Sequence, residues 1–362
     1  MSGTSADGID AALVDFSQQT PRFLHGQFTA FTDTLRGEII RLFTPGDNEI
    51  DALGELDIEL GQAYREAVSN LLNVAKVSAN EVVAVGLHGQ TVRHRPDFKH
   101  PFTLQTGNPY GISQQLGITV VSDFRRADMT LGGQGAPLGP LFHQALFQSN
   151  SKNRVIINAG GIANISYLKT NGNVTGFDTG PANGLMDAWI EKHQGARFDA
   201  DGQWADSGKI IPYLLNQWLE DPYYQLSPPK STGKEYFTLA QLGLTDPLDF
   251  AANDIQRTLC ELSAATIADG IKNYCPEADE IYISGGGAFN PLLVKRISEL
   301  TAIATKSTME IGVAPDWVEA VGFAWLAKAC LERQTIATGP VTGATKPVIL
   351  GAVHPANPVA WP

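Results

Sequence analysis

The sequence contains 362 residues, of which 43% are hydrophobic and 18% charged, values typical of a folded chain long enough for two hydrophobic cores. Lys and Arg number 26 against 38 Asp and Glu, a net charge of −12 that argues against nucleic acid or an anionic membrane as the main partner. No apolar run approaches the roughly 20 residues of a membrane span, and no charged-then-apolar signal region opens the chain. Cys260, Cys275 and Cys330 lack metal-ligand spacing, so we expect reduced thiols in a cytoplasmic protein.

Hydrophobic periodicity predicts strands alternating with helices along the chain. Strands are expected at 9–16, 24–33, 82–91, 117–124, 154–168, 174–183 and 280–290, where 154–168 holds two strands joined across a Gly-Gly turn. Helices are expected at 35–44, 48–75, 247–274 and 291–300. This alternation favours an α/β fold, and the hairpins make its sheets mixed. We expect one lobe at 1–125 and a second at 126–362, with 345–358 returning to the first lobe.

Four glycine-rich turns each lie beside a predicted strand: SGTSADG (2–8), NAGGIAN (158–164), FDTGPAN (177–183) and SGGGAFN (284–290). Glycine allows backbone amides to approach a ligand closely, and successive amides bind anions. A single turn of this kind is usually only a turn, but four of them indicate loops that hold the phosphate chain of a nucleotide. No Gly-Lys-Ser/Thr occurs, and no G-x-G-x-x-G follows the first strand, so neither a Walker loop nor a dinucleotide fingerprint is present.

Three carboxylates are candidates for chemistry. Asp178 stands at the end of an apolar strand, where it could act as a general base with a raised pKa or help to hold a metal. The alternative is a cap of the following helix, a role that Asn183 or Asp187 could also fill. Asp7 and Asp10 fit the shell of a hydrated Mg²⁺, and the alternative there is a solvated turn with Asp10 on an exposed strand face.

Polar groups that could recognise a substrate follow two of the strands. His88 and Gln90 lie in GLHGQTVRH (86–94), and with Gln105 and Asn108 they resemble a hydrogen-bonding edge for a polyhydroxylated ligand. The alternative for His88 is a satisfied core or surface histidine.

A pair of arginines, Arg125 and Arg126, lies between Asp123 and Asp128 in SDFRRADMTLGGQGAPLGPLFH (122–143). Such a pair suggests recognition of a carboxylate or phosphate, and an ion pair with either aspartate is the alternative. Lys234 and Glu235 in STGKEYF (231–237) form a surface turn or a lid on the substrate side.

Taken in order, these segments resemble those of the anhydro-N-acetylmuramic acid kinases over nearly the whole chain. The match rests on MSGTSADGID, GLHGQTVRH, LQTGN, SDFRRADMTLGGQGAPLGPLFH, NAGGIAN, GFDTGPAN, STGKEYF and SGGGAFN. The resemblance implies the two-lobed, actin-like (ribonuclease H-like) ATPase fold of sugar kinases, actin and heat-shock chaperones, with mixed sheets, flanking helices and an ATP cleft between the lobes.

The resemblance also implies a reaction. ATP phosphorylates O6 of 1,6-anhydro-N-acetylmuramic acid while water opens the anhydro bridge at C1, giving N-acetylmuramic acid 6-phosphate and ADP. Asp178 is similar in context to the family's catalytic base, which would deprotonate the water. The residues that look like the nucleotide-binding loops are Gly3, Thr4, Ser5, Ala6, Asp7, Gly8, Ile9 and Asp10 for the first phosphate loop, Asn158, Gly160, Gly161 and Asn164 for the second, and Gly285, Gly286, Gly287 and Asn290 for the adenosine loop.

By the same resemblance, His88, Gln90, Arg125 and Asp128 lie on the sugar side, where an arginine suits the lactyl carboxylate of muramic acid. ATP and Mg²⁺ at Asp7 and Asp10 are the implied cofactors. A role in peptidoglycan recycling and amino-sugar metabolism, a homodimer, and no nucleic-acid or membrane partner are also implied. Family members usually carry several residues of apolar strand before the MSGTS segment, so we expect a first loop anchored less firmly in a chain that starts at Met1.

Three other functions are compatible with these residues. A plain amino-sugar kinase would phosphorylate an ordinary hydroxyl without opening a bridge. A sensor of the same fold would bind ATP and sugar without turnover, although Asp178 and the four loops argue against it. A structural ATPase of the actin kind would form filaments, for which the sequence offers no support.

Overall fold

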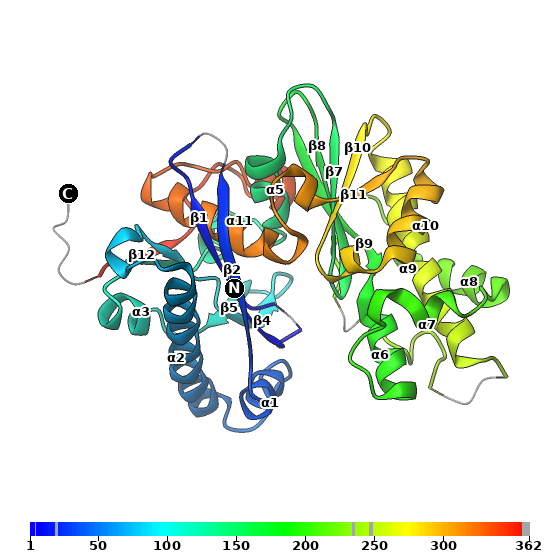
Figure 1. Ribbon diagram of the computed structural model, residues 1–362, viewed down its shortest axis with the longest axis horizontal. Helices are drawn as coiled ribbons and strands as arrows, with labels where there is room; N and C mark the ends of the chain where they lie inside the picture. Colours follow the sequence, from blue (N-terminus) through cyan, green and yellow to red (C-terminus); the bar gives the residue numbers. More distant parts are fainter. Residues whose placement is uncertain (4, 19–20, 234–235, 246–248, 357–362) are drawn as a thin grey trace. The chain divides into compact units, whose positions relative to one another are not determined.

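The computed structural model describes residues 1–3, 5–18, 21–233, 236–245 and 249–356, and the chain divides into two compact units. Unit 1 consists of Met1–Leu146 with Glu319–Pro362, and unit 2 is Phe147–Val318 (Figure 1). Residues 126–146, which we expected in the second lobe, therefore group with unit 1, as does the whole segment from Glu319 onward. A contact between distant segments accounts for this grouping: the buried Asp128 accepts a hydrogen bond from Thr342, 214 residues further along the chain.

Unit 1 holds three small sheets and the longest helix. The strands β1 (Gly8–Asp15) and β2 (Arg22–Ala30) form an antiparallel ribbon, and β4 (Gln90–Arg95) and β5 (Phe102–Thr106) form another. The third sheet has the order β12-β6-β3, from Ala352–His354, Val120–Ser122 and Val85–Gly86. The helices of unit 1 are α1 (Asp33–Arg41), α2 (Glu49–Ala75), α3 (Tyr110–Gln115), α4 (Arg126–Thr130), α5 (Gly139–Phe147) and α12 (Gly339–Thr342), together with α11 (Val318–Leu331), which starts at the last residue of unit 2.

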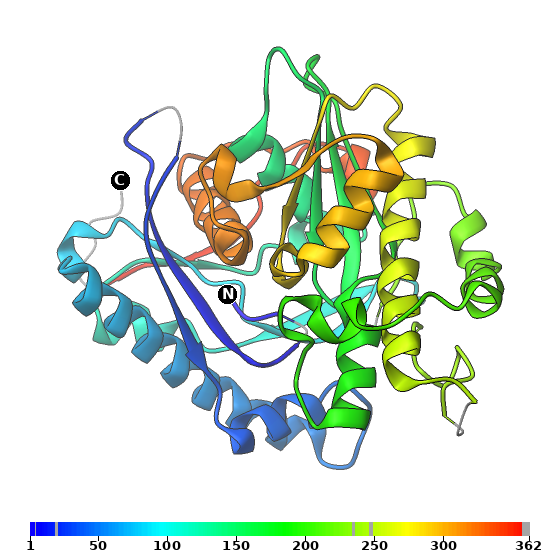
Figure 2. The ribbon, with the colours of Figure 1, turned by 45° about the vertical axis from the view of Figure 1, so that its right-hand side comes forward.

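The long helix α2 confirms the predicted helix at 48–75. Leu56, Leu60, Tyr64 and Leu71 are buried at the spacing of one helix face, as the periodicity predicts. Both strands of the β1–β2 ribbon pack against α2, and Figure 2 shows the ribbon running along this helix. The core of unit 1 therefore lies beneath the ribbon that continues from the first glycine-rich loop.

Unit 2 is built on one mixed sheet of five strands with the order β11-β10-β7-β8-β9. Three antiparallel strands, β7 (Arg154–Ala159), β8 (Ile162–Leu168) and β9 (Val174–Pro181), are continued by two parallel ones, β10 (Glu280–Ser284) and β11 (Thr305–Ser307). The main helices are α6 (Asn183–Gln194), α7 (Gln203–Asp206), α8 (Pro212–Leu219), α9 (Ala252–Tyr274) and α10 (Pro291–Thr301). Mixed sheets with flanking helices in both units confirm the α/β class, and this strand order fits the ribonuclease H-like fold.

Helix α9 covers one face of the unit 2 sheet (Figure 2). Gly270 of α9 lies so close to the sheet that an added Cβ would stand 2.9 Å from Thr179 and 3.4 Å from Phe177. Ile157, Ile165 and Phe177 pair across neighbouring strands and are buried in the core on this side. Because side chains alternate along a strand, the residues next to them in the sequence point to the opposite face.

Predicted elements were most accurate where the periodic segment is long. The expected strand at 82–91 is reduced to two residues, Val85–Gly86, and a loop follows before β4. The strand at 117–124 is likewise only three residues long, and the helix expected from 247 starts at Ala252. Within the described ranges, no helix combines the length and the apolar character needed to cross a membrane.

Candidate active site

Polar residues form a row across four strands of unit 2, one residue beyond the buried core row. Asn158 on β7 pairs with Asn164 on β8, and Asn164 pairs with Asp178 on β9. Ser284 of β10 pairs with Asn158 on its other side. Residues directly opposite each other in a sheet share a face with Cβ atoms about 4.5–5.5 Å apart. The sheet thus brings together three half-buried predicted site residues from two separate glycine-rich segments.

Asp178 is held in place through its backbone as well as its carboxylate. Its N–H donates to the carbonyl of Lys230 at 3.1 Å, and its carbonyl accepts from the Tyr223 hydroxyl at 2.8 Å. Since both groups point out of the sheet, the pair with Asn164 is of the non-hydrogen-bonded type, in which side chains approach more closely. A β-bulge at this point shifts the register between Ala163 and Asn164, a device that re-aims side chains beside active sites.

The carboxylate of Asp178 is engaged on one side only. Its Oδ2 accepts from the backbone N–H of Thr232 at 2.9 Å, while Oδ1 has no hydrogen-bond partner among the described residues. Burial raises the pKa of Asp178 to about 6, and the Thr232 N–H and the Lys230 ammonium act in the opposite direction. A carboxylate with this pKa and a free oxygen is suited to accept a proton near neutral pH.

Asp178 does not cap helix α6, which was the structural alternative. The N–H groups of Asn183 and Gly184 at the start of α6 donate to the carbonyls of Gly160 and Gly161, at 2.9 and 3.1 Å. The Asn183 side chain also donates to the carbonyl of Ala159 at 3.0 Å. Since the Gly160 carbonyl points toward α6, the N–H of Gly161 in the same trans peptide points away from the helix. The Gly-Gly turn thus presents an amide on the side opposite to α6.

The loop of Gly285, Gly286 and Gly287 packs closely against the same end of the sheet. An added Cβ on Gly285, which has φ +73°, would stand 2.7 Å from Asn158 Oδ1, and one on Gly287 would stand 2.5 Å from the Ala159 Cβ. Only glycine fits such an approach. Asn290 is buried, and its Oδ1 accepts from the Leu293 N–H at 3.1 Å as the N-cap of α10. The structure therefore gives this side chain a capping role, and its contact with a nucleotide stays a prediction.

In unit 1, the first glycine-rich loop is anchored by the segment that contains His88 and Gln90. The Gln90 amide Nε2 donates to the carbonyl of Gly3 at 3.1 Å, and Gln90 itself is completely buried. The Ser5 hydroxyl donates to Asp7 Oδ1 at 2.6 Å, and the side chains of both residues are exposed. Ala6, Gly8 and Ile9 are buried and have no polar side-chain atoms, so a contact with a ligand would involve only their backbone groups. Asp10 is half-buried within β1, and Thr4 lies outside the described residues.

Arg125 and His88 form a hydrogen-bonded pair in unit 1. Arg125 Nη2 lies 2.8 Å from His88 Nε2, and Nη1 donates to the carbonyl of Gly135 at 2.8 Å. Burial, followed by the neighbouring guanidinium, keeps the pKa of His88 well below its usual value, so the imidazole is neutral and accepts this bond. Burial also lowers the pKa of Arg125 to about 10, with Glu319 acting against it. No carboxylate of the described residues lies within 4 Å of the Arg125 guanidinium, which therefore suits an incoming anion.

Asp128 does not fit the predicted contact with the sugar. It is completely buried, with Oδ2 accepting from the Gly135 N–H and Oδ1 from the Thr342 hydroxyl, both at 2.8 Å. Both oxygens thus tie the 133–135 loop to α12 and are unavailable to a ligand. The second arginine, Arg126, is exposed and ion-paired with Asp123 at 2.6 Å, as the alternative reading of this segment expected.

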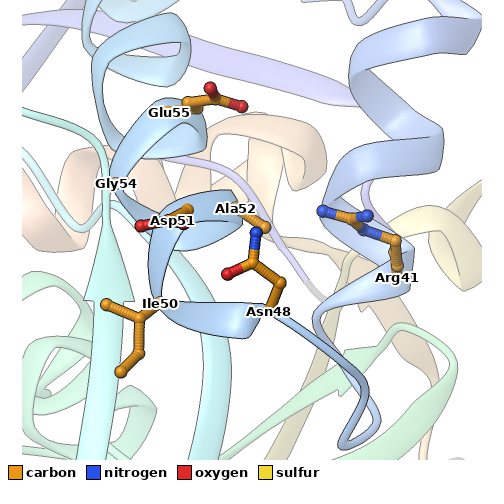
Figure 3. A pocket seen from close by; sticks show the side chains of 7 residues that line it. All are labelled: Arg41, Asn48, Ile50, Asp51, Ala52, Gly54 and Glu55. Carbon is orange, nitrogen blue, oxygen red and sulfur yellow. The ribbon is translucent and has the colours of Figure 1, made fainter.

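Hollows are present in the described part of unit 1. One of about 240 Å³ is lined by His88 together with the predicted polar residue Gln105, and by Asp57, Asp123 and His354 among others. The other, of about 590 Å³, lies where α1 and the first turns of α2 face each other (Figure 3). Its lining residues are Arg41, Asn48, Ile50, Asp51, Ala52, Gly54 and Glu55, and none of the predicted site residues in the described chain contributes to it. Of these two hollows, the smaller one is lined by a predicted sugar-side residue, His88.

The Asp7 and Asp10 carboxylates fit the donor chemistry of Mg²⁺ but not a closed metal cage. The Asp7 side chain is exposed and carries oxygen donors, and Mg²⁺ is commonly bound by one or two carboxylates together with waters and phosphate oxygens. Groups of three or more His, Cys, Asp or Glu with metal-binding arrangement are absent from the part of the chain that the structure describes. A metal here would therefore depend on the nucleotide for further ligands.

Residues 227–232 contribute more to the site than the sequence indicated. Lys234 and Glu235, the residues singled out as a surface turn or lid, lie outside the described residues. The residues just before them, Lys230 and Thr232, bond to Asp178 together with Tyr223. The signal that could have found them is the Pro228-Pro229 pair, because two successive prolines fix the backbone directly before Lys230.

The anhydro-N-acetylmuramic acid kinase family matches residues 1–356 of the chain. This chain belongs to that family. It is 49% identical to an anhydro-N-acetylmuramic acid kinase of Saccharophagus degradans, covering 98% of this chain and 97% of that protein. Kinases of the same name from Coxiella burnetii and Nitrosomonas europaea are 46% and 44% identical, with 98% of this chain covered in each case and 96% and 98% of those proteins. The family predicted from the sequence is thus confirmed, and with it the class of enzyme, a phosphotransferase.

Solved structures resemble the chain only distantly. The activator of a 2-hydroxyisocaproyl-CoA dehydratase from Clostridium difficile, solved with bound ADPNP, is 11% identical with a TM-score of 0.44, covering 90% of this chain and 98% of that one. A dehydratase component from Acidaminococcus fermentans has a TM-score of 0.41 at the same identity, with coverages of 87% and 96%. Membership of the anhydro-N-acetylmuramic acid kinase family, rather than these likenesses, supports the use of ATP.

Proposed function

We propose that this chain uses ATP to phosphorylate O6 of 1,6-anhydro-N-acetylmuramic acid while water opens the anhydro bridge, giving N-acetylmuramic acid 6-phosphate and ADP. The observation that carries the proposal is the carboxylate of Asp178, with one oxygen fixed by the Thr232 N–H and the other without a partner in the described chain. Relatives at 44–49% identity are named for this substrate. A role in peptidoglycan recycling follows from the chemistry of the product.

In the proposed mechanism, Asp178 Oδ1 accepts a proton from the water that attacks C1. The C1–O6 bond then breaks, O6 attacks the γ-phosphorus of ATP, and ADP is the leaving group. Asn158 and Asn164, which share a sheet face with Asp178, offer amide groups for orienting the water or a phosphate oxygen. We assign nucleotide binding to the Gly161 amide and the loop at Gly285–Gly287, since backbone amides stabilise charge on a transferring phosphoryl group.

Unit 1 supplies the proposed recognition of the sugar and part of the phosphate site. Arg125, already oriented by His88 and the Gly135 carbonyl, has further N–H groups to donate to the lactyl carboxylate. Asp7 and Asp10 would hold Mg²⁺, which neutralises phosphate charge when it is bound. Gln90 acts by fixing the first loop at Gly3 rather than by touching the sugar.

The proposal also includes a cytoplasmic location and a homodimeric assembly. All three cysteines are buried free thiols, which supports a reducing compartment such as the cytoplasm. The family resemblance supports a homodimer, which size-exclusion chromatography with light scattering would test.

The test measures ADP release and the mass of the sugar product in ¹⁸O-labelled water, for the wild type, Asp178→Asn and the control Asp206→Asn, which changes an exposed aspartate of the same unit. We expect a 6-phosphorylated product with the label at C1, and at least a 10²-fold loss of kcat in Asp178→Asn only. Label-free phosphorylation of N-acetylglucosamine would instead identify a plain amino-sugar kinase. Full activity in Asp178→Asn would remove this residue from the mechanism.

A further inference from the structure

The segment Lys230–Thr232 runs alongside Asp178 at the edge of the unit 2 sheet. Because β9 is the last strand in the sheet order, its outer backbone groups need partners from elsewhere. The Lys230 carbonyl accepts from the Asp178 N–H, and the Thr232 N–H donates to the Asp178 carboxylate. Two peptide groups on either side of Ser231 thus fix both the backbone and the side chain of the proposed base.

The Lys230 ammonium is held at a defined place by Tyr223. Its Nζ donates to the Tyr223 carbonyl at 3.3 Å and lies 4.7 Å from the centre of the Tyr223 ring. The hydroxyl of the same tyrosine donates to the Asp178 carbonyl. Tyr223 therefore links the Lys230 ammonium to β9, the strand that carries Asp178. A cation over an aromatic face is favourable when it is partly desolvated.

Lys230 has no carboxylate within 4 Å in the described chain, so its ammonium group is not neutralised by a salt bridge there. Half-buried, it loses hydration, and burial lowers its pKa while Asp178 raises it. The reciprocal effect is present at Asp178, whose pKa is raised first by burial and lowered by the Thr232 N–H and then by Lys230. A neutral side chain would fill this place at a smaller desolvation cost, which points to a use for the charge.

We propose that Lys230 is a positioning residue whose ammonium, seated on Tyr223, keeps Asp178 ionised at neutral pH. The inference rests on the proposed role of Asp178 as the base. The titratable groups that face the carboxylate from the described elements are Lys230 and the Tyr223 phenol, and burial raises the pKa of that phenol far above neutrality. Of the two, only Lys230 carries a charge at neutral pH.

The first experiment compares the pH dependence of kcat/KM for the wild type, Lys230→Gln and Lys230→Arg. We expect the acid limb of the Lys230→Gln profile to move to higher pH by roughly half a unit, because Lys230 is the weaker of the two groups that lower the pKa of Asp178, with rates similar to the wild type above pH 8.5. Lys230→Arg keeps the charge and should keep the limb close to its original position. The matched control is Lys192→Gln, because Lys192 also donates to backbone carbonyls and lies 5.4 Å from an aromatic ring, that of Trp189. A limb that stays in place in Lys230→Gln, together with an unchanged titration of the Asp178 carboxyl, overturns the proposal.

Chemical rescue separates charge from packing. In Lys230→Cys, treatment with 2-bromoethylamine restores an ammonium on an arm of nearly the same length, whereas iodoacetamide adds a neutral group. The native Cys260, Cys275 and Cys330 are buried, so the new thiol is the accessible one. Return of the acid limb with bromoethylamine but not with iodoacetamide supports the proposal, and equal behaviour of both adducts overturns it.

Carbon-13 NMR titration of the Asp178 carboxyl distinguishes this inference from the proposed function. If the carboxyl titrates at higher pH in Lys230→Gln but the kinetic limb stays in place, Lys230 acts on Asp178 as inferred and the assignment of Asp178 as the base fails. If the carboxyl titrates at the same pH in both proteins, the inference about Lys230 is wrong whatever Asp178 does. The spectrum also reports whether each variant is folded.

Discussion

The buried surroundings of Asp178 disfavour the ionised form of its carboxyl group. Its pKa is about 6 in the folded chain against an ordinary value of 3.8. Between these two values the folded chain binds the proton more tightly than the unfolded chain, so the free energy of unfolding decreases as the pH rises through this window. Above a pH of about 6 the full penalty applies, which is the cost of keeping a base ready for a proton.

We therefore expect Asp178→Asn to be more stable than the wild type at pH 8, with a melting temperature higher by about one to three degrees. The advantage should shrink by pH 4, where the wild-type carboxyl is itself protonated. Differential scanning calorimetry at both pH values measures this, with Asp206→Asn as the control whose difference should not depend on pH in this way. A pH-independent difference in Asp178→Asn would show that its carboxyl titrates normally.

Arg125 and Arg126 are neighbours in the sequence but have different surroundings. We expect Arg125→Met to raise KM for the anhydro-muramic sugar by about 10- to 100-fold, the range of a lost charge-assisted hydrogen bond. The same variant should change KM little for the analogue that lacks the lactyl group. The control is Arg36→Met, because Arg36 is exposed on α1, whereas Arg126, although exposed and paired with Asp123, lines the smaller hollow beside His88. Equal losses with both sugars would mean that Arg125 acts only by holding His88 and the Gly135 carbonyl.

For single residues, the sequence identified candidate side chains but not the residues that contact them. Asp178 stands at the end of an apolar strand, and that position was enough to make it a candidate for the catalytic base. Asp128 is also an aspartate in a polar segment, yet it is buried and bonded to Thr342 from far along the chain, a contact that no local pattern contains. Tyr223 and Lys230 meet Asp178 across about fifty residues for the same reason.

Among the elements, the glycine loops depend on close backbone approach. We expect Gly287→Ala to weaken ATP binding by at least tenfold in isothermal titration calorimetry, because its Cβ would stand 2.5 Å from that of Ala159 and the loop must shift. Gly286→Ala should have a smaller effect, since its Cβ would meet only the end of the Asn183 side chain, at 3.3 Å. Gly37→Ala, in the open on α1, is the control and should bind ATP as the wild type does. Unchanged affinity in Gly287→Ala would remove this loop from the nucleotide site.

Elements with long repeated patterns were predictable, and short ones were not. In helix α2 apolar residues recur at helical spacing over 27 residues, so its bounds were close to those expected. Strand β3 keeps only two residues, and after the Leu87 N–H has donated to the Val121 carbonyl at 2.8 Å the chain continues into the loop that holds His88. The bulge beside Asp178 has no signature in the sequence either, since it depends on the register between two strands.

For the whole chain, the two units differ in continuity. Unit 2 is one uninterrupted segment with its own core around α9, whereas unit 1 needs both chain ends. We expect a fragment of residues 147–318 to fold by itself and one of residues 1–146 to stay unfolded, because it lacks β12, which pairs with β6. Circular dichroism and amide NMR dispersion of both fragments measure this, and addition of a 319–362 fragment is the control for rescue. A folded 1–146 fragment would show that β12 is dispensable.

Composition and periodicity predicted two bodies but placed their boundary too early. The expected division at 125 separated α4 and α5 from unit 1, although Asp128 of α4 is bonded to Thr342. Such a division depends on contacts between distant segments, and these are decided by the closed fold rather than by the local sequence.

The nesting of unit 2 within the chain of unit 1 has a consequence for biosynthesis. As the polypeptide leaves the ribosome, the first 146 residues emerge without the partners that complete their sheet. All of unit 2 is made before those partners appear, a wait on the order of ten to thirty seconds at about 5–20 residues per second. During this interval β6 has an open edge on the side that β12 later covers. Nascent chains of this protein should therefore depend on chaperones mainly through their N-terminal half, even though unit 2 can already be in its final form.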